Sequence, residues 1–293
     1  MPRTAPAFFA SLLLLAPTVP THSPEEVAAW LARAATPLAS LDSGGDTAGF
    51  AALKAIVGEA RIVALGEATH GSHEFFAFKA RAVEYLVREL GFTDFAMETD
   101  AVAALAANEW LEHGRGDLDT ALKSISGLWR TAEYRELFTW LRAWNADPAH
   151  AQKVRFHGLD MAASGPTARR LRAYLATVDP EVEEGVGPVI ERLANGATLD
   201  PADLDGLLAL FEELHEPFVE RSSEREWALH RQHVVLLLQS YRQRALQGND
   251  QTSWRDRCMA DNARWILRQG GAGAKLVLSA HNGHVSRAGL TQV

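Results

Sequence analysis

The sequence of 293 residues contains one cysteine, Cys258, and no long run of basic residues. A single cysteine excludes an intrachain disulfide and a thiolate metal cluster. Its place in "RDRCMADN", within a predicted helix, favours a structural residue over a nucleophile. Asp and Glu outnumber Lys and Arg by 37 to 29. We therefore expect neither nucleic acid nor an anionic membrane surface as a partner.

Apolar segments long enough to cross a bilayer are also absent from the sequence. The first residues, "MPRTAPAFFASLLLLAPTVPTHS", contain Arg3, then an apolar stretch from Ala7 to Leu15, then Pro and small residues. This order is typical of a secretory signal peptide. We predict a signal peptide over residues 1–22 and an exported protein, periplasmic or secreted, with no membrane contact after processing. A cytoplasmic protein is the less favoured alternative.

Several well-known catalytic motifs are missing. The sequence has no G-x-S-x-G elbow, no H-E-x-x-H pair and no P-loop. Ser72 lies in a glycine-containing turn, where a serine usually caps a helix, and Ser279 lies within a predicted strand. These absences leave histidines and carboxylates as the groups able to carry chemistry.

Apolar strands alternate with helical segments along the chain. The predicted strands are "RIVALGE", "FTDFAMETD", "KVRFHGLD" and "AKLVLSAH", and helices are expected around Val102–His113 and Thr131–Ala146. This alternation predicts an α/β fold with a parallel-rich central sheet flanked by helices. Residues of about 165–269 are helical in pattern throughout. We expect them to form an insertion or cap between the third and fourth strands, within one domain of residues 23–293.

Each predicted strand ends in an ionisable residue. The strand ends are Glu67, Glu98, Asp160 and His281, and His284 follows in the next turn. The carboxyl ends of parallel strands share one edge of a sheet, where ligands bind. The sequence therefore predicts a catalytic pocket at this edge. The alternative is that the carboxylates cap the following helices, and it is strongest for Asp160.

The first strand end carries the densest group of polar residues. In "GEATHGSHE", Glu67 precedes His70 by three residues and Glu74 follows it by four, so His70 and Glu74 share one face of a helix that begins early. A neighbouring carboxylate can hold an imidazole in its basic tautomer, so that it takes a proton from water. A histidine in the fourth strand's turn, such as His281, could stabilise charge on a carbonyl oxygen. We expect His73 to face solvent or bond locally.

A divalent metal is the rival use of the same residues. Glu67, His70, Glu74 and His281 together supply the nitrogen and oxygen ligands that suit zinc or manganese. The sequence leaves both uses open. Our preferred prediction is a site without a cofactor, and the alternative is a metal-dependent hydrolase.

Four segments carry a resemblance to a known family. "ALGEATHGSHEFFAFKARAVEYLVRELGFTDFAMETD" resembles the opening signature of the erythromycin esterase family. The later segments "FHGLDM", "RDRCMADNARWIL" and "LVLSAHNGHV" are similar to that family's further motifs, in the same order. The similarity runs from about residue 40 to the end of the chain.

The resemblance implies an α/β core and the opening of a macrolide lactone, or a similar small-molecule ester, by activated water. It implies that His70 is the general base, that Glu67 orients it and that His281 acts in catalysis or substrate placement. Lys79 stands where some relatives carry Arg, which keeps the charge and loses bidentate geometry. Our assignments are catalytic for His70, Glu67, His281 and Glu98, and substrate-binding for Glu74, Lys79, His284 and Asp160.

The resemblance also bears on completeness and substrate. Members of the family usually continue beyond the motif in "LVLSAHNGHV", so we expect this chain to be C-terminally incomplete. Fold does not fix substrate, and another ester or an acyl group in polysaccharide metabolism is an alternative. A third alternative is a secreted relative that binds a ligand without catalysis.

Overall fold

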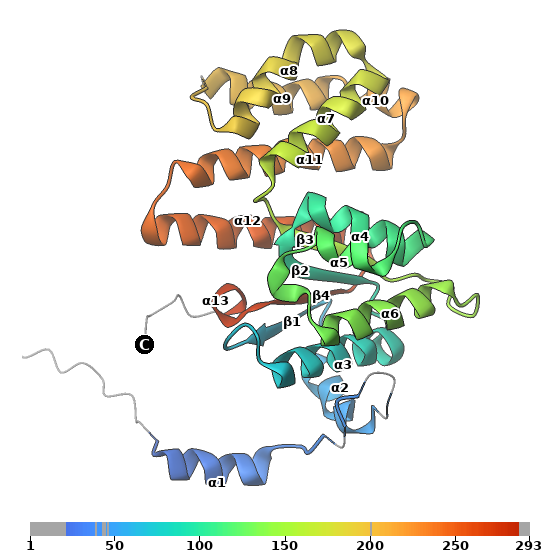
Figure 1. Ribbon diagram of the computed structural model, residues 1–293, viewed down its shortest axis with the longest axis vertical. Coiled ribbons are helices and arrows are strands. Elements are labelled where there is room, and N and C mark those ends of the chain that lie inside the picture. Colours follow the sequence, from blue (N-terminus) through green and yellow to red (C-terminus); the bar gives the residue numbers. More distant parts are fainter. Residues whose placement is uncertain (1–21, 39, 43–44, 46, 200, 287–293) are drawn as a thin grey trace, which may run out of the picture. The chain divides into compact units, whose positions relative to one another are not determined.

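The protein is described from a computed structural model, which covers residues 22–38, 40–42, 45, 47–199 and 201–286 (Figure 1). The predicted signal peptide lies outside these residues except for its last position, 22. The chain divides into two units, residues 1–37 and 38–293, so the expected domain of residues 23–293 is split after Pro37. In the first unit, α1 (Pro24–Ala34) begins at Ser23, whose side chain forms a capping box with Glu26.

The second unit contains a sheet of four parallel strands. They are β1 (Ile62–Glu67), β2 (Asp94–Asp100), β3 (Arg155–Asp160) and β4 (Leu276–His281), in the order β1-β4-β2-β3. Most residues of β2, β3 and β4 are buried, because helices cover both faces of a parallel sheet. The predicted parallel-rich sheet is confirmed, and β4 lies between β1 and β2.

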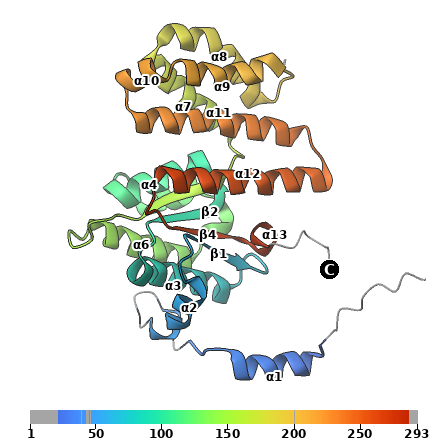
Figure 2. The same cartoon turned by 180° about the vertical axis from the view of Figure 1, so that it is seen from behind.

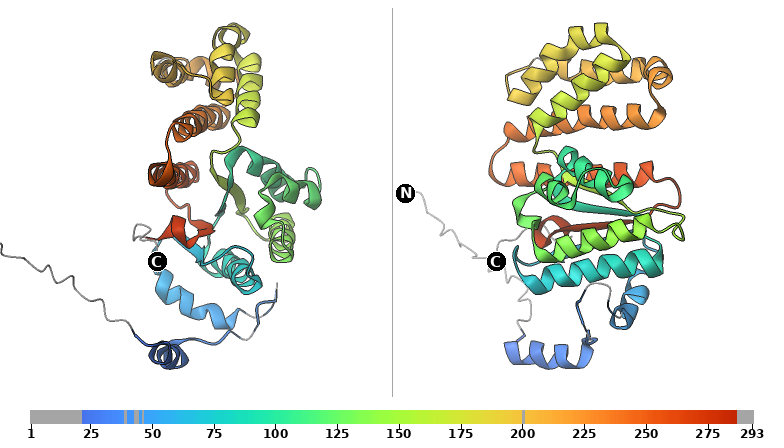
Figure 3. Two further views of the ribbon diagram at one scale, coloured as in Figure 1. Left: turned by 60° about the vertical axis from the view of Figure 1, so that its left-hand side comes forward. Right: turned by 45° about the vertical axis from the view of Figure 1, so that its right-hand side comes forward.

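Helices cover the two faces of the sheet unequally (Figure 3). One face packs into the main core with α3 (His73–Leu90), α4 (Ala101–His113), α5 (Leu118–Ser124) and α6 (Ala132–Ala146). The two helices expected around residues 102–113 and 131–146 are confirmed, and α5 was not predicted. The other face packs against α12 (Gly248–Gln269), whose Met259, Ala263 and Ile266 contact Ala96 and Leu159.

Helices α7 to α11 lie between β3 and β4 in the sequence and pack around a second core (Figures 1 and 2). They are α7 (Ser164–Val178), α8 (Pro180–Asn195), α9 (Pro201–Glu213), α10 (His215–Arg221) and α11 (Glu224–Arg244). This confirms the expected helical insertion. The last helix, α12, covers the sheet and does not join the core of the insertion, because its apolar side chains pack against those of β2 and β3.

Short elements complete the described part of the chain. They are η1 (Ala48–Phe50), α2 (Ala51–Val57), η2 (Gly127–Trp129) and α13 (Asn282–Val285). Among the described residues, none of the helices is both long enough and apolar enough to span a membrane.

Gly158 allows a close backbone approach that shapes the sheet edge. The pairing of β2 with β3 is irregular between Met97 and Asp100, and there the backbone of Thr99 and Asp100 lies against Gly158. A Cβ at position 158 would collide with those backbone atoms, so only glycine fits. This contact places the ends of β2 and β3 side by side.

Candidate active site

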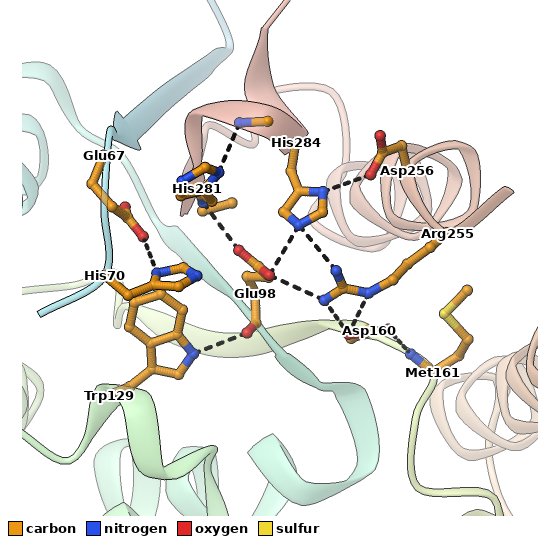
Figure 4. Close-up of polar contacts among 12 residues, drawn as sticks. Glu67, His70, Glu98, Trp129, Asp160, Met161, Arg255, Asp256, His281 and His284 are labelled. Carbon is orange, nitrogen blue, oxygen red and sulfur yellow. Dashed lines mark hydrogen bonds and ion pairs between the residues drawn. The ribbon is translucent and has the colours of Figure 1, made fainter. Parts of the chain in front are cut away.

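The four strand ends meet at one edge of the sheet, as the sequence predicts. Glu67 of β1 pairs in register with His281 of β4, and Asp160 ends β3 beside Asp100 of β2. Figure 4 shows the resulting row of side chains, which runs from Glu67 to Asp160 across the edge. The structure therefore brings together carboxylates and imidazoles that are far apart in the sequence.

His70 is held by Glu67 at the start of this row. Its Nδ1 lies 3.0 Å from Oε1 of Glu67, which is 1% exposed. A carboxylate only accepts hydrogen bonds, so Nδ1 donates and Nε2 keeps its lone pair. The His70 side chain is 31% exposed, and its ring lies edge-on to Trp129 at 5.1 Å between centroids. His70 thus has the tautomer and the access of a general base.

Lys79, which we assigned to substrate binding, lies behind Glu67. Its side chain is 1% exposed and forms an ion pair with Glu67, and its Nζ also donates to Ser279 Oγ at 3.2 Å and to the Ala280 carbonyl at 3.1 Å. Burial lowers the pKa of Lys79, and the negative charge of Glu98 opposes that effect. Lys79 is therefore buried among protein groups and is placed to hold Glu67.

His281 faces His70 across the first strand's turn. The two ring centroids lie 5.1 Å apart. Nδ1 of His281 accepts a hydrogen bond from the Gly283 N–H at 3.1 Å, so Nε2 carries the proton and donates to the Ala68 carbonyl at 3.2 Å. This long contact can be exchanged for one to a substrate oxygen, which gives His281 the chemistry of a hydrogen-bond donor beside the base.

Glu98 accepts three hydrogen bonds at the centre of the row. They come from the His281 N–H at 3.0 Å, Arg255 Nη2 at 3.1 Å and His284 Nε2 at 3.1 Å. Burial alone raises the pKa of Glu98, but the hydrogen bonds from His284, His281 and Arg255 outweigh it and lower the pKa to about 2. Glu98 is therefore a permanent carboxylate near neutral pH, suited to positioning other groups and unsuited to donating a proton.

Arg255 links Glu98 to Asp160. From α12 it contacts Asp160 Oδ2 through Nε at 2.9 Å and through Nη2 at 2.6 Å. The other carboxylate oxygen of Asp160 accepts from the Met161 N–H at 2.8 Å. Both oxygens of this nearly buried side chain are thus occupied. Asp160, which we assigned to substrate binding, is thus placed to hold Arg255. Its bond to Met161 is not a cap of α7, which begins after Ala163.

His284 lies between two carboxylates. Its Nδ1 is 2.6 Å from Asp256 Oδ1, and its Nε2 is 3.1 Å from Glu98 Oε1 and 2.9 Å from Arg255 Nη1. The hydrogen bond with Glu98 raises the pKa of His284, burial lowers it, and Asp256 raises it further. The charged ring donates to both carboxylates, whereas the neutral ring accepts from Arg255. A change in the protonation state of His284 therefore exchanges the partner of Nε2, which is Glu98 for the charged ring and Arg255 for the neutral ring.

Glu74 is not part of this cluster. It lies exposed in the first turn of α3 and makes no hydrogen bond or ion pair with the other candidate residues. A substrate-binding role for Glu74 therefore has no support from the geometry. His73 is exposed and bonds to Glu133, as expected for a residue that points away from the site.

The residues named for a divalent metal do not converge on one point. Glu67 binds His70 and Lys79 with its two oxygens, and both ring nitrogens of His281 bond to backbone groups. Glu74 lies outside the cluster. Among the described residues, no group of three His, Cys, Asp or Glu side chains is arranged to hold a metal ion. The four residues named as metal ligands are therefore not brought together around one point.

Sequence reasoning missed Arg255 and Asp256, and it undervalued Trp129. Arg255 precedes Met259 by four residues and Ile266 by eleven, so it lies on the stripe of α12 that faces the sheet. A charged residue on an apolar stripe is the signal that could have found it. Trp129 is buried, and its Nε1 donates to the Glu98 carbonyl at 2.9 Å.

Comparison with known proteins identifies the family of this chain. The erythromycin esterase family model matches residues 87–293. Erythromycin esterase type II of Escherichia coli is 24% identical over an alignment of 270 positions, and the match covers 81% of this chain and 64% of the esterase. The chain thus spans less than two thirds of that relative's length.

Solved structures show the same fold. A Bacillus cereus protein aligns with a TM-score of 0.80 and 28% identity over 92% of this chain and 69% of its own. A mutant of erythromycin esterase EreC in its open conformation aligns with a TM-score of 0.61 and 20% identity, covering 83% of this chain and 66% of that one. The family match covers well over half of the sequence, and it supports a hydrolase-like function. The chain belongs to the erythromycin esterase family.

Proposed function

We propose that this protein is an ester hydrolase that opens a macrolide lactone or a similar small-molecule ester with water. The observation that carries the proposal is the His70–Glu67 pair. Glu67 bonds to Nδ1 of His70, and the His70 ring lies 5.1 Å from the ring of His281, measured between centroids. Family membership and the hydrolase activity named for the E. coli relative support it.

In the proposed reaction, Nε2 of His70 removes a proton from water while the water oxygen attacks the carbonyl carbon. The carbonyl π electrons move to oxygen, and the Nε2–H of His281 donates to that oxyanion. When the intermediate collapses, the carbon–alkoxide bond breaks and the proton on His70 passes to the leaving alkoxide. Glu67 stabilises the imidazolium, and Lys79 pairs with Glu67 from behind.

Two further parts of the proposal concern conditions and location. We propose that the reaction needs no metal, because the side chains of the site bond to one another and do not converge as ligands. We also propose that the protein is exported, on the basis of residues 1–22. N-terminal sequencing of protein recovered from the producing cells tests export, since it identifies a cleaved segment directly.

The proposal is tested with the purified chain, erythromycin, simple lactones and simple esters. We expect His70→Gln to lower turnover by about 10²–10⁴-fold, the usual contribution of a general base. His73→Gln is the matched control, because this nearby histidine is exposed and bonds outside the cluster. Equal circular dichroism spectra establish that both variants fold. Unchanged turnover in His70→Gln would refute the proposal.

A further inference from the structure

A cavity of about 530 Å³ lies between β3, α4, α11 and α12, which are labelled in Figure 1. None of the candidate active-site residues lines it. The cavity runs beside the first four residues of β3, from Arg155 to Gly158. The active-site row meets this strand at its last residue, Asp160. It is a separate feature with a size typical of small-molecule sites.

The walls of the cavity are predominantly apolar. They include aromatic rings from three elements and aliphatic side chains from α4 and α11: Phe156, Trp227, Trp265, Leu105 and Leu236. Apolar and aromatic walls bind the body of a ligand by removing its surface from water. The cavity therefore suits an apolar molecule.

Four ionisable side chains of the walls already have hydrogen-bond or ion-pair partners in the protein. Arg155 and His157 pair with Asp94, Glu224 pairs with His215, and Arg225 lies 3.9 Å from Glu112. A charged ligand would thus enter without a free counterion and would lose its hydration. These pairs favour a neutral ligand.

Two adjacent residues of α11 supply free hydrogen-bonding capacity. Gln232 donates from Nε2 to Asn262 Oδ1 at 2.9 Å, and its Oε1 accepts nothing from the part of the chain that the structure describes. His233 is 1% exposed, and its Nδ1 has no partner among the described residues. Burial lowers the pKa of His233, and His230 and Arg170 lower it further, to about 3. The acceptor that a ligand in the cavity can use is therefore Gln232 Oε1, whose lone pairs are not taken by the described residues.

β3 is an edge strand of the sheet, and one of its outward backbone N–H groups is already bonded to a side chain. The Phe156 N–H, which points away from β2, donates to Asn108 Oδ1 at 2.7 Å. An incoming strand would need that N–H for its own ladder of hydrogen bonds. The capped edge favours a small molecule over a peptide segment.

We propose that this cavity is a second binding site, which takes a small neutral molecule with an apolar body and a hydroxyl group. The apolar body lies against Trp227 and Trp265, and the hydroxyl donates to Gln232 Oε1. The site is independent of the proposed hydrolysis at His70.

Three probes of one shape test the proposal by equilibrium dialysis near neutral pH. They are 2-naphthol, 2-methylnaphthalene, which lacks the donor, and 2-naphthoate, which carries a charge. We expect one saturable equivalent of 2-naphthol, bound about fivefold more tightly than 2-methylnaphthalene, the ratio expected for one hydrogen bond. We expect 2-naphthoate to bind most weakly. Absence of saturable 2-naphthol binding, or equal affinity for all three probes, would overturn the proposal.

Variants locate the bound probe. Ala228→Phe on α11 and Leu105→Trp on the opposite wall fill the cavity and should each abolish binding. Gln232→Met should remove the preference for 2-naphthol, and Asn262 Oδ1 then keeps its bond from Gln239 at 3.1 Å. Ester turnover should be unchanged in Ala228→Phe. Binding that survives both filling variants, each confirmed as folded by circular dichroism, would place the probe elsewhere and overturn the proposal.

Discussion

The carboxylate of Glu98 offers a quantitative test of the network at the sheet edge. In the folded protein its pKa is about 2, against an ordinary value of 4.5, because His284, the His281 N–H and Arg255 stabilise the charged form against burial. At about 1.4 kcal/mol per pH unit, this difference corresponds to at most about 3.5 kcal/mol of folding free energy. Glu98→Gln removes the charge but keeps an acceptor for the His281 N–H. We therefore expect a loss of about 2 kcal/mol near pH 7.

The sign of the pH dependence follows from the lowered pKa. The stabilisation is fully present above the ordinary value of 4.5 and is lost as the pH falls through about 2. The stability difference between wild type and Glu98→Gln should therefore stay constant from about pH 7 to pH 5 and shrink to under half near pH 3.

Urea unfolding, followed by tryptophan fluorescence at several pH values, measures this difference. Glu89→Gln is the matched control, since Glu89 is an exposed carboxylate on α3. It should match wild type throughout. A Glu98→Gln deficit that is equally large at acid and neutral pH, or that is absent at neutral pH, would refute the reasoning.

Three further outcomes are expected. Lys79→Met leaves the buried Glu67 carboxylate without its counter-charge and should lower the free energy of unfolding in urea by about 3–5 kcal/mol. Adding Glu67→Gln should recover part of that loss, and no recovery would contradict the ion pair. Asp256→Asn should lower the pKa of His284 in an NMR titration. Because that pKa is raised in the folded protein, the associated stability is present below about 6.5 and is lost as the pH rises through the folded value; an unchanged pKa would exclude the Asp256 contact. Turnover should survive dialysis against a chelator, and an activity that disappears and returns with zinc would contradict metal-free hydrolysis.

The sequence alone determined the order of strands along the chain, their parallel arrangement and the site of the helical insertion. Apolar runs bounded by turn residues, and helical periodicity between them, are local patterns that the folded chain preserves. The pairing of Glu67 with His70 was also predictable, because both lie within one strand-to-helix turn. The motifs that resemble the family were sufficient for its assignment.

The tertiary structure alone decided which side chains face the site and which lie behind it. Lys79 was expected to meet substrate, yet the packing of α3 against β4 buries it against Ser279, two hundred positions away. Arg255 carries no local signal of its contact with Asp160, since α12 reaches that edge only by crossing the sheet. The cavity beside β3 has no pattern in the sequence at all, because four separate elements build its walls. Periodicity fixes the face on which a side chain lies, whereas burial and pairing depend on what packs against that face.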